Sequence, residues 1–138
     1  MKRVTGLGGV FFKCEDPDKV KEWYQKHLGL NTDTYGTTFM WRRPEAPDKA
    51  GTTQWSPFPA STDYFKPSDK PFMFNYRVEN LTALLDVLRS EGVQIVGEMQ
   101  QYNYGKFAYI MDCDGNKIEL WEPADDAFPN LWKEGTTY

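Results

Sequence analysis

Hydrophobic and polar residues follow each other along this chain in an order that occurs twice. From Val4 to Cys14, apolar residues alternate with others at the period of two that is typical of a β-strand. The next segment, residues 17–28, carries apolar side chains at helical spacing on one face: Val20, Trp23, Tyr24 and Leu28. Asp16 is suited to cap the start of this helix, and Gly29 to end it.

The same order returns at residue 72. Phe72–Val78 predicts a strand, and Asn80 takes the capping place that Asp16 has in the first copy. The following helix ends at Gly92 and directs four apolar residues inward: Leu81, Leu84, Leu85 and Leu88. Three shorter strands are expected after each helix, at 32–35, 38–42 and 52–56 in the first copy and at 94–101, 107–111 and 117–122 in the second.

Each copy is therefore predicted to form one βαβββ module. Duplicated units of this size usually share one core, so we expect a single α+β domain over residues 1–138. Module 1 covers about residues 1–57 and module 2 about 72–123, with a Pro- and Ser-rich linker at 58–71 and a tail at 124–138.

The period of two also predicts which strand residues face away from the helices. One face of each first strand must meet the apolar side of its helix, and Val10, Phe12 and Cys14 belong to that face. The opposite, concave face is then assigned to Gly9, Phe11, Lys13, Met73, Asn75, Arg77, Lys117, Glu119 and Trp121. A face that carries this many polar side chains is a poor core and a reasonable ligand pocket.

Composition narrows the function classes. The chain has 26% charged residues and a formal net charge of −4, which argues against nucleic acid or an anionic membrane as a partner. No apolar run approaches the ~20 residues of a membrane span, and the first residues lack the apolar core of a signal peptide. Cys14 and Cys113 have no metal-ligand spacing and suit a reducing compartment, so the cytoplasm is the expected location.

Two motifs point to a known family. The first copy opens with Gly-Gly-Val-Phe-Phe-Lys-Cys-Glu-Asp-Pro (residues 8–17), and the second closes with Asp-Cys-Asp-Gly-Asn-Lys-Ile-Glu-Leu-Trp-Glu-Pro (residues 112–123). With the duplicated modules, this resembles the vicinal oxygen chelate superfamily, the group of glyoxalase I, bleomycin-resistance protein and extradiol dioxygenases. The resemblance implies a U-shaped, half-barrel mixed sheet with helices on its convex face, and it implies a homodimer, for which residues 128–132 of the tail offer a contact.

The resemblance also implies where a metal ion would bind. Metal-using members carry ligands on the first and last strand of each module, positions that fall here on Gly9, Gln54, Met73 and Glu119. Glycine and methionine cannot ligate a hard divalent ion, and one carboxylate with one amide does not complete a site. We therefore expect no metal and no other cofactor; a metal-dependent alternative would need a further ligand, such as Asp63, Glu98 or a residue of a second subunit.

Glu119 is the candidate catalytic residue and has two interpretations. It pairs with Lys13 or Arg77 as a structural charge, or it is a partly desolvated carboxylate that acts as a general base. Lys13 and Arg77 are repeat-equivalent, so they could instead face a ligand carboxylate from two sides. The residues expected to bind a ligand are Phe11, Lys13, Trp41, Gln54, Trp55, Asn75, Arg77, Tyr109 and Trp121.

The sequence thus leaves three functions open. The first is a protein without a metal that binds a small organic molecule in an aromatic cleft of mixed charge, by sequestration or with acid–base chemistry at Glu119. The second is a metal-dependent glyoxalase-like lyase or isomerase that uses Glu119 with an unidentified ligand set. The third is a component of a larger assembly whose cleft stays empty.

Overall fold

A computed structural model describes residues 1–124 and 135–137 of the chain. In this part of the chain one sheet has the strand order β5-β6-β7-β4-β1-β3-β2-β8. Its strands are β1 (Val4–Cys14), β2 (Thr37–Arg43), β3 (Ala46–Pro59), β4 (Phe72–Val78), β5 (Ile95–Tyr102), β6 (Gly105–Met111), β7 (Lys117–Pro123) and β8 (Thr136–Thr137). The helices are α1 (Pro17–Leu28) and α2 (Leu81–Ser90).

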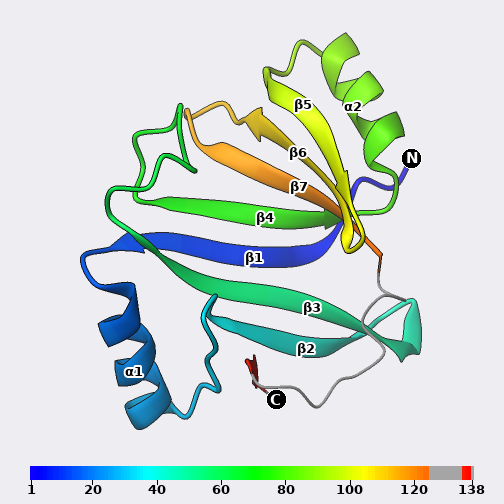
Figure 1. Cartoon of the computed structure of the whole chain (residues 1–138). Coiled ribbons are helices and arrows are strands. Elements are labelled where there is room, and N and C mark those ends of the chain that lie inside the picture. Colours follow the sequence, from blue (N-terminus) through cyan, green and yellow to red (C-terminus); the bar gives the residue numbers. More distant parts are fainter. Residues whose placement is uncertain (125–134, 138) are drawn as a thin grey trace.

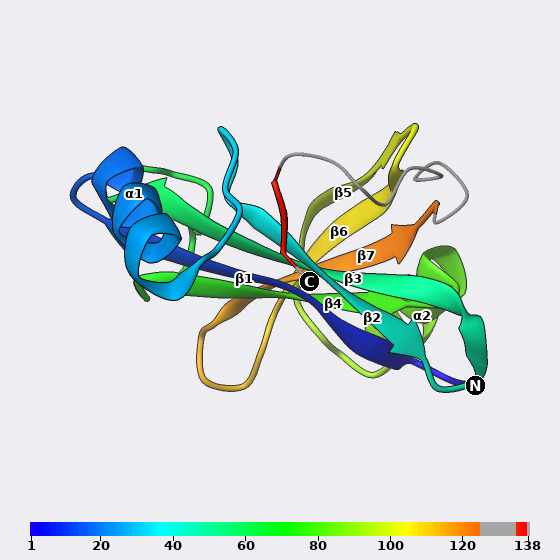
Figure 2. The same ribbon diagram turned by 90° about the horizontal axis from the view of Figure 1, so that it is seen from below.

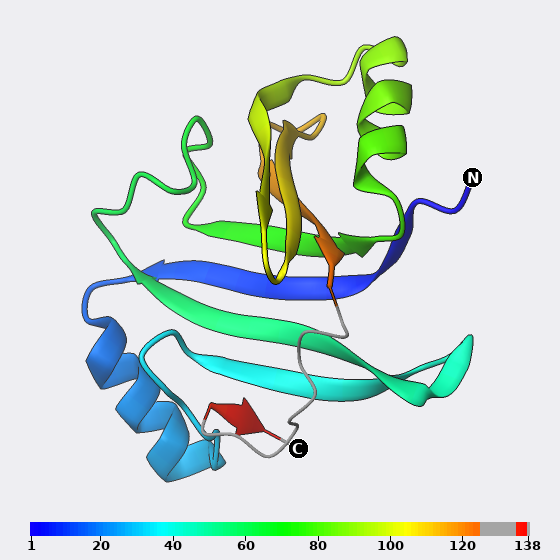
Figure 3. The ribbon, with the colours of Figure 1, turned by 45° about the vertical axis from the view of Figure 1, so that its right-hand side comes forward.

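The predicted α+β fold with a mixed, open half-barrel sheet is confirmed. The first strands of the two repeats, β1 and β4, lie antiparallel at the centre of the sheet. Each has a parallel neighbour on its other side, β3 beside β1 and β7 beside β4. Figure 1 shows the helices at opposite ends of the sheet, and Figures 1 and 3 show β5, β6 and β7 turned across the direction of the central strands.

Both helices begin at the predicted caps. The Asp16 side chain accepts a hydrogen bond from the Lys19 N–H at 3.2 Å, and Asn80 accepts one from the Ala83 N–H at 3.1 Å. The two helices pack differently, and Figure 2, like Figure 1, shows them at opposite ends of the sheet. All four predicted leucines of α2 are buried, whereas α1 buries no residue completely. Trp23 is 53% exposed, so its predicted core position is wrong.

One edge of the sheet differs from the predicted modules. Residues 32–35 form no strand, and the chain bends at residues 34 and 35, because the Asp33 carboxylate accepts hydrogen bonds from the backbone N–H groups of Tyr35 and Gly36. The edge place beside β2 is taken by β8, which pairs parallel to it (Figure 3). Thr37 is fully buried there, with its hydroxyl 2.6 Å from that of Thr137.

The apolar core is divided between the two faces of the sheet. The larger cluster joins the α2 leucines to β4, β6 and β7 on the convex side. A second cluster of Phe11, Phe65 and Met73 lies at the end of the concave side, under the segment that links the modules. The tail contact predicted at 128–132 lies outside the described residues, and no described helix has the length and apolar character to cross a membrane.

Candidate functional site

The concave face of the sheet contains a cavity of about 680 Å³, within the usual range for ligand pockets. Its floor comes from β1, β3, β4 and β7, and its walls come from the segment before β2, the linker and the β5–β6 hairpin. More than half of the described residues that line it are aromatic. Among residues 1–124 and 135–137, the lining consists of Gly8, Phe11, Asp33, Tyr35, Gln54, Ser56, Phe58, Tyr64, Asn75, Tyr104, Phe107, Glu119 and Trp121.

Glu119 is the most buried charged group of this lining, at 3% exposure. Its strand places it beside Asn75, whose Nδ2 donates a hydrogen bond of 2.5 Å to Glu119 Oε1. The other carboxylate oxygen accepts a short hydrogen bond from the Tyr64 hydroxyl. Both oxygens are therefore acceptors, which is the arrangement that an ionised carboxylate makes. The expected pairing of Glu119 with Lys13 or Arg77 is replaced by these neutral donors.

Two tyrosines extend the hydrogen-bond network away from Glu119. The Tyr64 and Tyr109 hydroxyls are 2.6 Å apart. Because Tyr64 uses its single hydrogen toward Glu119, Tyr109 must donate to Tyr64. Burial, followed by the neighbouring Glu119 charge, raises the pKa of Tyr64 and of Tyr109 well above the usual value for a phenol. Both phenols are thus held in the protonated form that donates hydrogen bonds.

Lys117 lies over the rings of the two tyrosines of this network, Tyr64 and Tyr109. Its ammonium donates to the Tyr64 carbonyl at 2.8 Å and stands 4.5 Å from the centroid of the Tyr109 ring. Lys117 is 8% exposed, and this desolvation lowers its pKa, against the opposing effect of Glu119. Lys117 acts on Glu119 through its field, and it does not line the cavity.

The other polar residues of the floor are also hydrogen-bonded, but one oxygen atom of Asn75 is not. Gln54 accepts from the Thr38 hydroxyl at 2.7 Å and donates to Ser56 Oγ at 3.1 Å. Asn75 Oδ1 is buried without a hydrogen-bond partner in the part of the chain that the structure describes, and it lies so close to Gly8 that a Cβ atom at position 8 would collide with it. Asn75 therefore contributes an unused acceptor to the floor.

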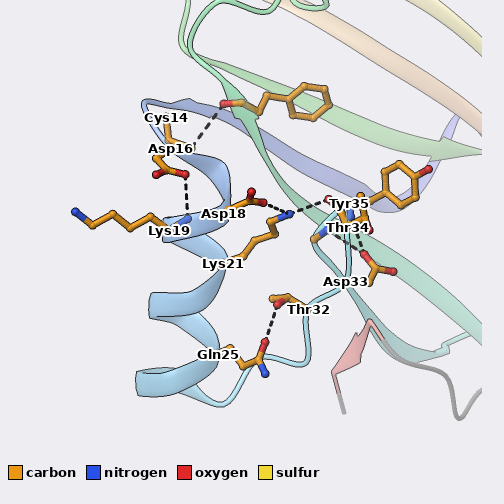
Figure 4. Close-up of polar contacts among 12 residues, drawn as sticks. Cys14, Asp16, Asp18, Lys19, Lys21, Gln25, Thr32, Asp33, Thr34 and Tyr35 are labelled. Atoms are coloured by element: carbon orange, nitrogen blue, oxygen red, sulfur yellow. Dashed lines mark hydrogen bonds and ion pairs between the residues drawn. The ribbon is translucent and has the colours of Figure 1, made fainter.

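Asp33 and Tyr35 reach the cavity from the segment between α1 and β2. Figure 4 shows how this segment is held against the helix. The Lys21 ammonium donates to the Thr34 carbonyl at 2.8 Å and lies 3.2 Å from Asp18. The bend at Asp33 then directs the chain into β2. The segment that was predicted as a strand thus forms one wall of the site.

Several residues predicted to bind a ligand lie outside this cavity. Arg77 is 3% exposed and lies between the rings of Trp41 and Trp121, at 5.4 and 5.2 Å from their centroids. Arg77 and Trp41 line a separate cavity of about 140 Å³. Tyr109 lines an adjoining pocket of about 280 Å³, and the Lys13 ammonium stands 5.7 Å from the centroid of the Phe65 ring.

Trp55 is on the wrong face of the sheet for the predicted role. Its ring packs on Phe12 and Tyr24, with centroids 5.4 and 4.7 Å away, on the side of α1. Adjacent residues of a strand face opposite sides, so Gln54 and Trp55 could not both line the cavity. Of the predicted ligand-binding residues, the cavity brings together Phe11, Gln54, Asn75 and Trp121, along with Glu119.

The residues of the site do not fit a divalent metal ion. A Cβ atom at Gly9 would lie 2.8 Å from the Phe11 ring, so this ring fills the place of a ligand side chain. Met73 is fully buried in the cluster with Phe11 and Phe65. Among the residues that the structure describes, no group of three or more His, Cys, Asp or Glu side chains could hold an ion. A metal site needs about three such donors.

Six lining residues of the walls were not among the ligand-binding residues predicted from the sequence: Asp33, Tyr35, Phe58, Tyr64, Tyr104 and Phe107. Phe58 and Tyr64 belong to the linker region, where their rings stack at a centroid distance of 5.5 Å and an angle of 3°. Tyr104 and Phe107 come from the β5–β6 hairpin. The one available signal was the density of aromatic residues in these otherwise polar segments.

The comparisons with known proteins agree with this architecture. Among solved structures, methylmalonyl-CoA epimerase from Mycobacterium tuberculosis is 28% identical, with a TM-score of 0.61, over 92% of this chain and 93% of the epimerase. A variant of the Streptomyces coelicolor methylmalonyl-CoA epimerase in complex with 2-nitronate-propionyl-CoA is 15% identical, with a TM-score of 0.65, over 88% and 99%. The second likeness shows the fold alone.

Sequence comparisons give the family. No curated protein matches the chain. A family model, described as Glyoxalase/Bleomycin resistance protein/Dioxygenase superfamily, matches residues 6–120. This range includes most of β1, all of β4 and the β7 strand as far as Leu120, so the resemblance found in the sequence is confirmed. The chain belongs to the Glyoxalase/Bleomycin resistance protein/Dioxygenase superfamily.

Proposed function

We propose that the protein binds a small organic molecule with a planar, apolar part in the concave cavity, and that it does so without a divalent metal ion. The observation that carries this proposal is the cavity of about 680 Å³ with aromatic walls and one buried carboxylate on its floor. Glu119 is the polar anchor, because its oxygens are fixed by Tyr64 and Asn75 while the residue still lines the cavity. The predicted homodimer and cytoplasmic location stay predictions.

The absence of a metal from the proposal rests on the donor set. Glu119 is one carboxylate that already accepts two hydrogen bonds, and the Phe11 ring occupies the space that a side chain at position 9 would need. These groups offer no chelating geometry. Binding should therefore be unchanged when chelator replaces added Mn²⁺, Co²⁺, Ni²⁺ or Zn²⁺. Metal analysis of protein purified without chelator should give only background. A near-stoichiometric metal content would overturn this part of the proposal.

A direct test compares a residue of the cavity wall with a residue on the opposite face of the sheet. Phe107 stacks on Trp121 in the cavity wall, at a centroid distance of 5.9 Å and an angle of 7°. We expect compounds from a library of small aromatic molecules to quench tryptophan fluorescence and to raise Tm. Phe107→Ala should weaken the binding of these compounds by about tenfold or more. The matched control is Phe74→Ala, which removes the same side chain from the convex face. Equal loss in both variants would contradict binding in the cavity.

A second candidate function is proton exchange on an acyl-CoA. It is favoured by the 28% identity to the Mycobacterium tuberculosis methylmalonyl-CoA epimerase over nearly the whole of both chains. In such a reaction the Glu119 carboxylate would take the proton from the carbon next to the thioester, and the electron pair would move into the thioester carbonyl. Returning the proton to the other face of that carbon would complete an epimerisation.

This candidate has its own assay. Methylmalonyl-CoA incubated with the protein in D₂O and chelator should lose its α-proton signal in ¹H NMR if Glu119 exchanges it. Glu119→Gln should abolish the exchange, while Phe74→Ala should leave it intact. No exchange by the wild type, at substrate concentrations that would saturate the protein, excludes the function and leaves the binding proposal standing.

A further inference from the structure

We infer that the cavity selects an organic cation: a protonated amine carried on a planar, apolar body. The inference rests on the proposed function, namely that the cavity binds a small molecule. The first observation is the sign of charge. The two charged residues of the lining are Asp33 and Glu119, and within the described part of the chain no lysine or arginine lines the cavity. A negatively charged group would enter against both carboxylates.

The cations near the cavity are directed elsewhere. Arg77 is stacked between two tryptophan rings and donates to Thr52 Oγ1 at 3.2 Å. Lys13 lies over the Phe65 ring, and Lys117 donates to the backbone of Tyr64. The expectation that Lys13 and Arg77 would face a ligand carboxylate is therefore not supported, because neither lines the cavity. The charge that a ligand meets is that of Glu119 and Asp33.

The walls suit a cation for a second reason. A ring face carries negative charge density, so a desolvated ammonium gains from lying over it. Phe107 and Trp121 are stacked, and so are Phe58 and Tyr64, while Tyr104 completes the wall on the hairpin. This aromatic lining accommodates a planar apolar body and the ammonium attached to it. Aromatic walls around carboxylates are the arrangement that recognises amines and not anions.

The floor supplies acceptors for the N–H groups of such a ligand. Glu119 presents carboxylate oxygens, and Asn75 is 2% exposed with an Oδ1 that has no hydrogen-bond partner among the described residues. The hydroxyl of Tyr64 and the Nδ2 of Asn75, which are donors, are already bound to Glu119. On the β4 and β7 part of the floor the unused capacity is thus that of acceptors, which an ammonium can satisfy and a carboxylate cannot, whereas Gln54 and Ser56 on β3 can also donate.

The test compares three probes of similar shape that differ in charge. These are 2-phenylethylammonium, 2-phenylethanol and 3-phenylpropanoate, titrated at pH 7 in chelator and followed by tryptophan fluorescence and calorimetry. We expect the ammonium to bind at least about tenfold more tightly than the alcohol, and the carboxylate more weakly than the alcohol. Glu119→Gln should bring the affinity for the ammonium to within about threefold of the affinity for the alcohol, measured on the same variant.

A matched control separates local from overall charge. Glu98→Gln removes the same charge from the exposed face of β5, and it should keep the wild-type ratio between ammonium and alcohol. Equal affinities of the three probes, or tighter binding of the carboxylate, would overturn the inference and leave the proposed binding function intact. If none of the three probes binds at a probe concentration of about 10 mM, the proposed function itself is contradicted. An equal loss in Glu98→Gln and Glu119→Gln would assign the preference to net charge and also overturn it.

Discussion

The hydrogen bond from Tyr64 to Glu119 gives the sharpest test of how the site is built. Tyr64→Phe removes one hydroxyl and keeps the ring, which stacks on Phe58 and contacts Phe65. The variant leaves one carboxylate oxygen of a residue that is 3% exposed without its donor. Glu119 keeps the bond from Asn75. The change therefore removes the bond to a buried charge, together with the bond that the Tyr64 hydroxyl accepts from Tyr109.

The magnitude follows from the kind of bond. A hydrogen bond to a charged group contributes about 1.5–3 kcal/mol, and we expect Tyr64→Phe to lower the free energy of unfolding by about 2 kcal/mol. With an unfolding entropy of about 2.1 cal/mol/K per residue, a chain of 138 residues should lose about 7 °C in Tm. Tyr35→Phe is the control, because the Tyr35 side chain belongs to a residue that is 76% exposed. It should change stability by less than about 0.5 kcal/mol.

The assay is a double-mutant cycle in urea at pH 7 with wild type, Tyr64→Phe, Glu119→Gln and the double variant. The two side chains share one bond, so their effects should not add, and we expect an interaction energy of about 1–2 kcal/mol. An interaction energy below about 0.5 kcal/mol would refute the reasoning. The tyrosine would then be a wall residue whose hydroxyl does not hold the carboxylate.

Three further predictions concern stability. Gly9→Ala should cost about 1–3 kcal/mol in thermal unfolding, because its Cβ would lie 2.8 Å from the buried Phe11 ring; a neutral effect would contradict that packing. Burial raises the pKa of Tyr109, so the contribution of its protonated phenol to the free energy of unfolding is intact below pH ~10 and is lost above it. Unfolding free energy should thus fall less steeply between about pH 9.5 and 11 in Tyr109→Phe than in wild type. Hydrogen bonds from Asn116 lower the pKa of Asp112. The contribution of the Asp112 carboxylate to the free energy of unfolding is therefore present above pH ~4 and lost below it. The Tm deficit of Asp112→Asn at pH 7 should therefore shrink at pH 3.

The parts of the fold that the sequence predicts are those set by local chemistry. Asp16 and Asn80 cap their helices because a short acceptor side chain satisfies the first free N–H groups, whatever the rest of the chain does. Phe11, Asn75 and Glu119 reach the concave face because side chains of a strand alternate in direction. Neither inference needs knowledge of a distant neighbour.

The errors arise where a distant contact decides. The bend at Asp33 competes with strand formation, and the edge of the sheet is instead occupied by β8, more than 90 residues later in the sequence. Trp55 was assigned to the cavity together with its neighbour Gln54, but one residue along a strand reverses the face, and contacts with Tyr24 of α1 show on which side Trp55 lies. Tyr64 lies in a linker without any period, so nothing local predicts that it meets Glu119, 55 positions away.

The structure joins two features that look independent in the sequence, the missing chelating residues and the aromatic cavity. Gly9 leaves room for the Phe11 ring at the place where the family resemblance would put a metal ligand, and Met73 packs in the same apolar cluster. In the proposed site without a metal ion, no metal charge neutralises Glu119. The carboxylate then needs other partners, and hydrogen bonds from Tyr64 and Asn75 supply them. Both donors are neutral, and Lys117 acts on Glu119 from outside the cavity, so an incoming cation is the ligand that would complete the neutralisation of Glu119 from within the cavity.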